Sequence, residues 1–339
     1  MNNFLKILQD KSHILADGAT GTNLFGMGLE TGDPPEPWNI DYKDRIRSLH
    51  QGFVDAGSDL FLTNSFGGTS FRLRLHNLES KVFELNKAAA VIAREVADHS
   101  NRLIIVAGSM GPTGEMIEPH GLMTPKEAME AFKAQAEGLA EGGVDVLWLE
   151  TMYSMEELEA AMDAVKDIGL PVCATMSFDT AGKTMMGVTP ANLAKKSKDL
   201  NLNGFGANCG IGAPDLLATI NDISKNVDPD TVVISKANCG IPEFVDGNIV
   251  YSGTEELMSE YVQIAMNSGA KIIGGCCGTT FDHVKAMRKA MDAHVVSSPP
   301  TLEEIEQKIG VMSEGSKSIF KGDDSKPTKA RRSRRKRVY

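Results

Sequence analysis

The chain has 339 residues, 42% of them hydrophobic and 24% charged, a composition typical of globular proteins, and no apolar run approaches the ~20 residues that cross a bilayer. Residues 1–16 lack the apolar segment and cleavage site of a secretory signal, so we expect a cytoplasmic protein that does not enter a membrane. The net charge is −10, but residues 326–339 hold eight Lys or Arg and no acid, which leaves −18 on residues 1–325 and argues against a nucleic-acid surface on the folded part.

The N-terminal part of the chain contains a short helical pattern over residues 4–8 and an apolar run over 14–16. The glycine-rich segment 17–22 follows and is predicted to be a loop. Because it has neither a dinucleotide fingerprint nor a Lys-Ser/Thr pair, a nucleotide site is not favoured there. The proline-rich segment 32–38 is also expected to be a loop, with Trp38 as a hydrophobic anchor.

From residue 44 onward, helical and strand patterns alternate. Helices are predicted over residues 44–56, 80–98, 125–142, 154–168, 190–200, 215–226, 254–268 and 282–293. Strands are predicted over residues 14–16, 59–66, 103–109, 145–151, 171–178, 204–209, 232–238 and 271–277. Eight strands that are each followed by a helix predict an α/β fold, a (β/α)8 TIM barrel, whereas a doubly wound open sheet is the alternative.

The barrel is expected to form a single domain over residues 1–309, ending in a short helix over 302–309. Residues 310–339 are rich in Ser, Lys, Gly and Arg and poor in apolar residues, which predicts a disordered Lys/Arg-rich tail. This tail could bind an anionic surface, nucleic acid or an acidic partner, although a solvated segment is the simpler interpretation.

Three cysteines stand where predicted strands end. Cys276 and Cys277 are adjacent, and their flanking glycines permit the bend that would turn both thiols to one point. Cys209 closes another short strand. Three thiolates with an open position would form a reactive zinc site, whereas the alternative is that they are small buried hydrophobes. Cys173 and Cys239 are interpreted as spare.

Polar residues also gather at predicted strand ends, where barrel enzymes carry their chemistry. The residues at these ends are Asp17, Asn64, Glu150, Cys209, Asn238, Cys276 and Cys277. A zinc ion held by three cysteinates favours thiol alkylation over hydrolysis, because it can keep a substrate thiol deprotonated. Asp17 and Glu150 could then hold the ammonium of an amino acid.

Five segments resemble the homocysteine S-methyltransferase family over about residues 10–295. They are DGATGT (17–22), TNSF (63–66), GSMGP (108–112), GANC (206–209) and GGCCG (274–278). The resemblance implies that Cys209, Cys276 and Cys277 bind Zn²⁺ and that Asp17, Gly18 and Glu150 bind homocysteine. Asn238 corresponds to a fourth, displaceable ligand of some members, although Cys239 stands where the family usually has alanine. No catalytic side chain is predicted beyond these residues.

The methyl donor is predicted from a narrower resemblance. Trp38 stands where betaine-dependent members place a tryptophan against trimethylammonium, but the cage tyrosines of animal enzymes correspond to Gly67 and Thr151, so Phe66 or Tyr153 would have to rebuild the cage. The length, the segment 176–187 and the basic tail resemble bacterial betaine–homocysteine methyltransferases. Betaine is therefore the favoured donor for making methionine.

Other donors and functions stay open at this stage. S-methylmethionine and dimethylsulfoniopropionate are alternative donors, and a corrinoid protein would be the partner in a split cobalamin-dependent methionine synthase. A zinc-binding regulatory protein, or a protein bound to RNA or a membrane through its tail, is the non-enzyme alternative. The sequence does not determine whether the chain forms a homo-oligomer.

Overall fold

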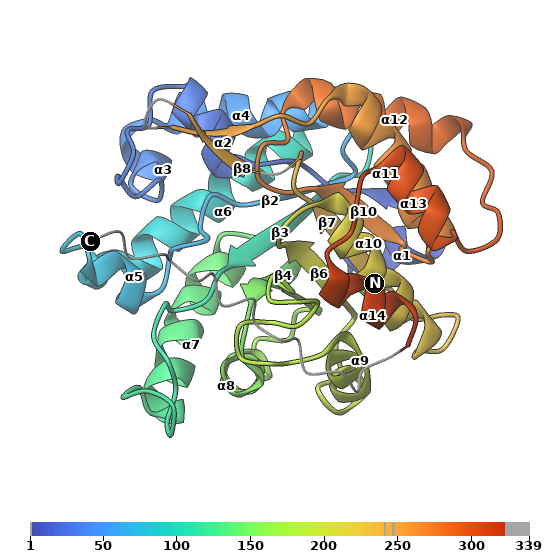
Figure 1. Ribbon diagram of the computed structural model, residues 1–339. Helices are drawn as coiled ribbons and strands as arrows, with labels where there is room; N and C mark the ends of the chain where they lie inside the picture. The colour runs from blue at the N-terminus through green and yellow to red at the C-terminus, as the bar shows by residue number, and fades with distance from the viewer. Residues whose placement is uncertain (1, 241, 246–247, 323–339) are drawn as a thin grey trace, which may run out of the picture.

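The computed structural model describes residues 2–240, 242–245 and 248–322. Eight parallel strands form a nearly closed barrel with helices between them, which confirms the (β/α)8 TIM barrel (Figure 1). The barrel strands are β1 (Ile14–Leu15), β2 (Leu60–Leu62), β3 (Ile105–Met110), β4 (Val146–Met152), β5 (Val172–Met176), β6 (Gly204–Cys209), β7 (Val233–Ala237) and β10 (Ile272–Gly275). They are hydrogen-bonded in the order β1-β10-β7-β6-β5-β4-β3-β2, so from β2 to β10 each barrel strand is paired with the next one in the chain, and β10 is paired with β1.

The helices surround this barrel and are joined to it by loops. They are α1 (Asn3–Asp10), α2 (Thr20–Gly26), α3 (Trp38–Asp41), α4 (Lys43–Ala56), α5 (Ser70–Arg74), the 3₁₀ helix η1 (Glu79–Lys81), α6 (Val82–Asp98), α7 (Pro125–Glu141), α8 (Met155–Val165), α9 (Pro190–Asp199), α10 (Ala213–Lys225), α11 (Glu255–Asn267), α12 (Phe281–Ala293), α13 (Leu302–Lys308) and α14 (Glu314–Phe320). An antiparallel hairpin, β8 (Pro242–Val245) and β9 (Asn248–Tyr251), stands between β7 and α11. No helix in the described part of the chain is long and apolar enough to cross a membrane.

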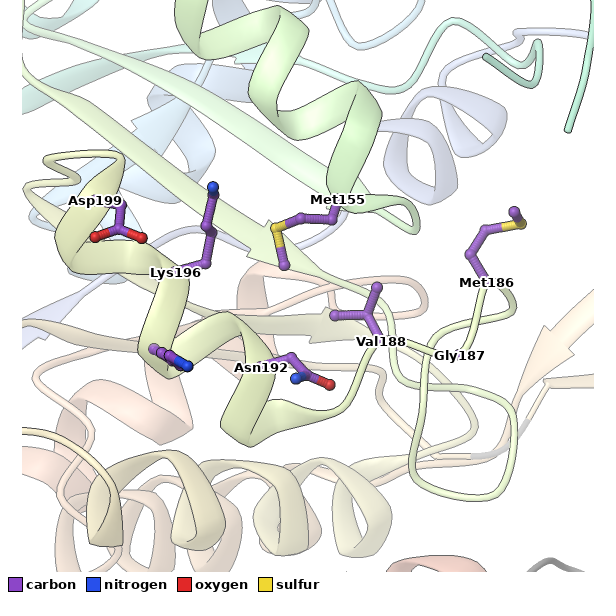
Figure 2. A pocket seen from close by; sticks show the side chains of 8 residues that line it. Met155, Met186, Gly187, Val188, Asn192, Lys196 and Asp199 are labelled. Carbon is purple, nitrogen blue, oxygen red and sulfur yellow. The ribbon is translucent and has the colours of Figure 1, made fainter. Parts of the chain in front are cut away.

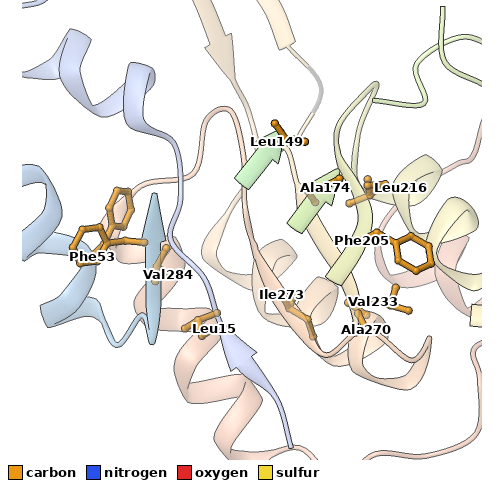
Figure 3. Packing of buried hydrophobic residues seen from close by; sticks show 14 of the residues in the cluster. Leu15, Phe53, Leu149, Ala174, Phe205, Leu216, Val233, Ala270, Ile273 and Val284 are labelled. Carbon is orange, nitrogen blue, oxygen red and sulfur yellow. The ribbon is translucent and has the colours of Figure 1, made fainter. Parts of the chain in front are cut away.

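The apolar side chains of the strands alternate between the inside and the outside of the barrel. Ile14 and Ile272 belong to the inner cluster, which Phe4 of α1 joins from the N-terminal end of the barrel. Their neighbours Leu15 and Ile273 belong to the outer cluster, which packs against the helices (Figure 3). Most strands therefore contribute to both cores, whereas β6 contributes Phe205 and Ala207 to the outer cluster and no residue to the inner one.

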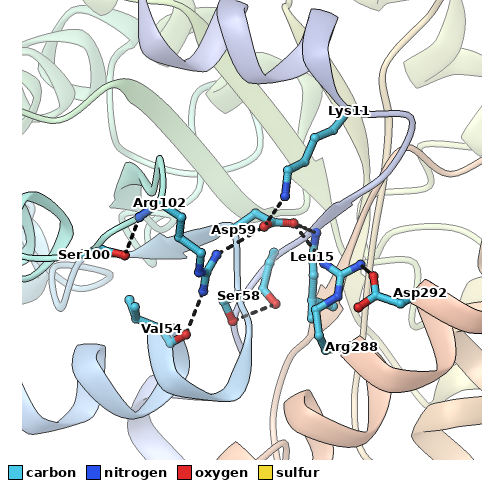
Figure 4. A network of polar contacts seen from close by, with 10 residues as sticks. Lys11, Leu15, Val54, Ser58, Asp59, Ser100, Arg102, Arg288 and Asp292 are labelled. Carbon is cyan, nitrogen blue, oxygen red and sulfur yellow. Dashed lines mark hydrogen bonds and ion pairs between the residues drawn. The ribbon is translucent and has the colours of Figure 1, made fainter.

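The seam between β1 and β2 has no strand ladder, and the aspartate Asp59 bridges it. Its backbone N–H donates to the Leu15 carbonyl at 2.7 Å, and its carboxylate accepts from the Leu15 N–H at 3.0 Å. The buried carboxylate is also paired with three cations, Lys11 at 2.7 Å, Arg102 at 3.2 Å and Arg288 at 3.1 Å (Figure 4). Side-chain electrostatics thus take the place of strand pairing at this seam.

Two sequence-based predictions are wrong in the described residues. The predicted loop over residues 17–22 ends early, since helix α2 begins at Thr20; Leu24 of this helix is fully buried, and the Asn23 amide donates to the carbonyls of Ala19 and Thr279. These tertiary contacts outweigh the low helix propensity of the two glycines in this segment.

The second correction concerns the predicted disordered tail over residues 310–339. Its first part contains α14, which packs on α10, where the Lys225 ammonium lies 5.1 Å from the centroid of the Phe320 ring. Asp215 of α10 accepts hydrogen bonds from the Ser316 hydroxyl at 2.6 Å and from the Ser313 N–H at 3.2 Å. One carboxylate therefore anchors a segment with too few apolar residues to give a sequence signal. Residues 323–339, with the basic cluster, lie outside the described residues.

Candidate metal centre and substrate cavity

A cavity of about 450 Å³ opens at the carboxyl ends of the barrel strands. Its lining includes six of the seven residues predicted to bind metal or substrate, namely Asp17, Gly18, Glu150, Cys209, Cys276 and Cys277. Gly18 is required by close packing, because a Cβ atom there would lie 2.6 Å from the Thr279 carbonyl oxygen. The barrel thus brings together residues separated by up to 260 positions in the sequence, from Asp17 to Cys277.

The three cysteines predicted as metal ligands form one cluster. The Sγ atoms of Cys209, Cys276 and Cys277 all lie within 4.8 Å of one another. Cys209 has a left-handed backbone with φ of 60°, an unusual conformation for a residue with a side chain. Cys173 is buried in the inner barrel core, and Cys239 is also buried and does not belong to the cluster, as their interpretation as spare thiols predicted.

Asn238 fixes the backbone on both sides of the thiol cluster. Its amide nitrogen donates to the Gly210 carbonyl at 2.9 Å, and its Oδ1 accepts from the Cys277 N–H at 3.1 Å. The side chain is buried and engaged at both ends. This geometry makes Asn238 a positioning residue for the loops after β6 and β10, whereas a role as fourth ligand stays a prediction.

The chemistry of the three thiols suits a soft metal ion. A hydrogen bond with Cys276 acts to lower the pKa of Cys209, but the bond with Cys277 and burial outweigh it and raise the pKa to about 11. The metal-free thiols are therefore protonated near neutral pH, and a bound cation would displace those protons. Three sulfur donors at this spacing fit zinc and do not fit magnesium or calcium.

Next to the thiols, two carboxylates and one lysine face the cavity. Lys236 of β7 is 3% exposed, and its Nζ lies 2.5 Å from Asp17 Oδ1. Asp17 Oδ2 accepts from the Leu62 N–H of β2 at 2.8 Å. The Ser109 hydroxyl donates to Glu150 Oε1, and burial raises the pKa of Glu150 against the opposing effect of Lys236.

Sequence reasoning assigned no role to Lys236. The available signal was its place inside the apolar run 232–238, where a charged residue on a barrel strand is unusual. Burial acts to lower the pKa of Lys236, but Asp17 and Glu150 outweigh it and raise the pKa, so the side chain is an ammonium ion.

The residue after Glu150 is also held in an unusual conformation. Thr151 has φ of 61°, and it is hydrogen-bonded by Asn208 of β6, a strand separated from β4 by β5. Asn208 Oδ1 accepts from the Thr151 N–H at 2.9 Å, and its amide donates to the Thr151 hydroxyl at 2.7 Å. This clamp ties the end of β4, which carries Glu150, to the strand that carries Cys209.

Trp38 is not among the residues that line the cavity, and its contact with the donor stays a prediction. Trp38 is 8% exposed, and its ring packs on Tyr42 with centroids 4.9 Å apart. The Arg45 guanidinium lies over the same ring at 4.9 Å, so a protein cation already occupies it. Aromatic side chains that do line the cavity are those of Phe25, Phe66 and Tyr251.

A second hollow lies on the surface between α8 and α9 (Figure 2). Its lining includes Met155, Val188, Asn192, Lys196 and Asp199, and no thiol is among these lining residues. It shares no lining residue with the carboxyl-end cavity. The chemistry of the molecule is therefore assigned to the carboxyl-end cavity.

The fold and the site together define a TIM-barrel protein with a three-cysteine cluster at the carboxyl ends of its strands. Comparison with protein families narrows this class. The model of the homocysteine S-methyltransferase family matches residues 14–291, and the chain belongs to that family. Membership of this family supports the assignment of the chain as a methyltransferase that acts on homocysteine.

Solved structures show the same fold. The metallated form of the homocysteine methyltransferase MmuM from Escherichia coli has a TM-score of 0.72 and 20% identity, covering 85% of this chain and 99% of that chain. Its apo form has a TM-score of 0.68 and 19% identity, covering 85% and 100%. A methyltransferase from Methanosarcina mazei has a TM-score of 0.56 and 11% identity, covering 86% and 97%.

Proposed function

We propose that this protein transfers a methyl group to the thiol of homocysteine and so forms methionine. The observation that carries the proposal is the cluster of Cys209, Cys276 and Cys277, with Sγ atoms within 4.8 Å of one another, in one cavity with the Glu150 carboxylate. In this proposal the three cysteines serve the substrate thiol and Glu150 serves an ammonium in the same cavity. Homocysteine carries both groups.

The three cysteines would hold a zinc ion. Zinc bound there would keep the substrate thiol deprotonated and therefore nucleophilic at neutral pH. The metallated form of MmuM, a protein with the same fold, supports a metal in this proposal. The protein's own contribution is to fix the three thiols, which Asn238 does through the backbone of Gly210 and Cys277.

Glu150 would bind the substrate ammonium. Its Oε1 accepts from Ser109, whereas among the described residues no donor contacts Oε2, which is free to accept from a ligand. The Asn208 clamp on Thr151 holds this carboxylate in place. A charge-assisted hydrogen bond of this kind contributes about 1.5–3 kcal/mol.

The donor would be a methylated cation, with betaine favoured. Phe25, Phe66 and Tyr251 line the cavity and offer aromatic faces, to which a quaternary ammonium is attracted by ~0.5–2 kcal/mol. The substrate sulfur forms the new S–C bond while the C–N bond of betaine breaks, and the electron pair leaves with dimethylglycine nitrogen. This displacement requires no proton-transfer side chain, and the site offers none beyond the groups named.

A methionine-formation assay tests the proposal. The zinc-loaded protein is given homocysteine with betaine, S-methylmethionine, dimethylsulfoniopropionate or a methylated corrinoid in parallel. Product with betaine is the expected result, and product with another donor would replace betaine while leaving homocysteine methylation intact. Tight zinc binding without product from any donor would overturn the proposal in favour of a zinc-binding regulatory protein.

A further inference from the structure

Lys236 is a charged residue that lines the cavity and has no role in the proposed thiol activation or ammonium binding. It lies on β7, opposite Asn208 of β6 on one side and Gly274 of β10 on the other. Its side chain is 3% exposed, yet it lines the cavity. Burying an ammonium is costly unless it is paired, so we expect the Lys236 ammonium to have anionic or hydrogen-bonding partners.

Asp17 is the partner that the protein supplies, and both of its oxygens are engaged. Oδ1 faces Lys236 at 2.5 Å, and Oδ2 accepts from the Leu62 N–H at 2.8 Å. The second contact links β1 to β2 across the seam that has no strand ladder. Asp17 would have to give up one of these contacts to bind a substrate ammonium, so it is better suited to holding Lys236 than to binding the ligand.

The Lys236 ammonium has donors to spare. An ammonium carries three N–H groups, and within the described part of the chain Asp17 is the one hydrogen-bond acceptor for Lys236. It is also the one cation among the described residues that line the cavity. Two unused donors on a nearly buried cation, facing a cavity, form a receptor for an anionic ligand group.

We propose that Lys236, held in place by Asp17, binds the α-carboxylate of the amino-acid substrate, whereas Glu150 binds its ammonium. This assignment rests on the proposed function and makes its substrate specificity explicit. The fixed charges Lys236 and Glu150 match the two charges of a zwitterionic amino acid. Asp17 becomes a positioning residue that acts through Lys236.

Substrate analogues separate the two contacts. 3-Aminopropane-1-thiol lacks the carboxylate of homocysteine, and 4-sulfanylbutanoate lacks the ammonium. The ratio of kcat/KM for homocysteine to that for the aminothiol reports the carboxylate contact. The corresponding ratio for 4-sulfanylbutanoate reports the ammonium contact.

For Lys236→Met we expect the first ratio to fall roughly ten- to hundredfold and the second to stay unchanged, because one charge-assisted contact is lost. Glu150→Gln should show the reverse pattern. Lys87→Met, which removes an exposed lysine paired with Glu141, is the matched control and should change neither ratio. Zinc content is measured in every variant.

Lys236→Met leaves Asp17 buried without its cation and so could lower stability. The double variant Asp17→Asn with Lys236→Met removes both charges and keeps an oxygen to accept from Leu62, and it should show the same fall in the first ratio. An unchanged first ratio in both variants would overturn the assignment. If the second ratio, for 4-sulfanylbutanoate, fell in these variants instead of the first, the assignment would also be overturned, since Asp17 would then be the ammonium receptor. Absence of any product from homocysteine in the wild type would overturn the proposed function itself, and this assignment with it.

Discussion

The carboxylate of Asp59 accepts a hydrogen bond from the Leu15 N–H at 3.0 Å and thereby joins the first and second strands where the barrel has no ladder. Three cations surround that buried carboxylate, so its removal leaves Lys11 and Arg102 without this partner, whereas Arg288 keeps Asp292. The barrel is thus closed by a charged cluster on the side opposite the cavity.

Asp59→Ala is therefore expected to lower the free energy of unfolding by about 3–5 kcal/mol, the cost of breaking a buried ion pair. Urea denaturation at neutral pH measures this change. Asp44→Ala is the control, because Asp44 also pairs with an arginine but its side chain is 96% exposed. Equal effects of the two substitutions would contradict the role of Asp59 in closing the seam.

Cys276→Ala is expected to abolish stoichiometric zinc binding, because only two thiols of the cluster are left. Metal analysis after dialysis measures the zinc content per chain. Cys173→Ala and Cys239→Ala remove buried thiols outside the cluster and should retain the metal. Full zinc occupancy in Cys276→Ala would show that the cluster is not the metal site.

Glu150→Gln is expected to raise the KM for homocysteine roughly ten- to hundredfold while leaving the zinc content unchanged, because a charge-assisted contact becomes a neutral one. Steady-state kinetics at saturating donor measure the effect. Glu157→Gln is the matched control, since Glu157 is also buried but accepts from Thr113 outside the cavity. Loss of zinc in Glu150→Gln, with normal homocysteine binding, would show that the carboxylate serves the metal.

Phe66→Leu is expected to raise the KM for betaine by about two- to thirtyfold, because an aromatic face worth ~0.5–2 kcal/mol is lost, and to leave the KM for homocysteine nearly unchanged. Trp38→Phe should not act selectively on the donor, since Arg45 already covers that ring. Phe83→Leu, at a half-exposed position away from the cavity, serves as the control. A selective loss of betaine in Trp38→Phe alone would assign the donor contact to the tryptophan instead.

His50 should make the fold sensitive to acid. Burial lowers its pKa from 6.5 to about 3, and its ring stacks on Phe61 at 4.7 Å. Above pH 6.5 the histidine is neutral in the folded and unfolded states, whereas below it only the unfolded state gains a proton, so stability falls as the pH drops toward 3. Between pH 7.5 and 5, the free energy of unfolding measured by urea denaturation should fall by roughly 2 kcal/mol less in His50→Leu than in the wild type. Parallel pH profiles for the two proteins would contradict this.

The regular parts of the fold and the metal cluster could be predicted because they depend on local patterns. The apolar run around Ile272 indicated a strand, and glycines beside Cys276 and Cys277 indicated a bend at its end. Once eight strands were counted, barrel topology placed Cys209 beside that pair. Nothing further about packing was needed.

The features that were missed depend on contacts between distant residues. Arg45 covers Trp38, and Asp17 pairs with Lys236 across 219 positions of sequence. Helix α14 depends on Asp215, about 100 positions earlier. None of these contacts leaves a periodic pattern, so propensity and spacing did not reveal them.

The aromatic side chains of the cavity stand on segments other than those that carry the thiols. Phe25 lies on α2 and Phe66 follows β2, whereas the cysteines end β6 and follow β10. If the protein has the proposed function, a library confined to positions 25 and 66 would vary the contacts of the methylated donor while every member keeps the same three thiols. The donor half and the thiol half of the proposed reaction would then evolve at different rates on one scaffold.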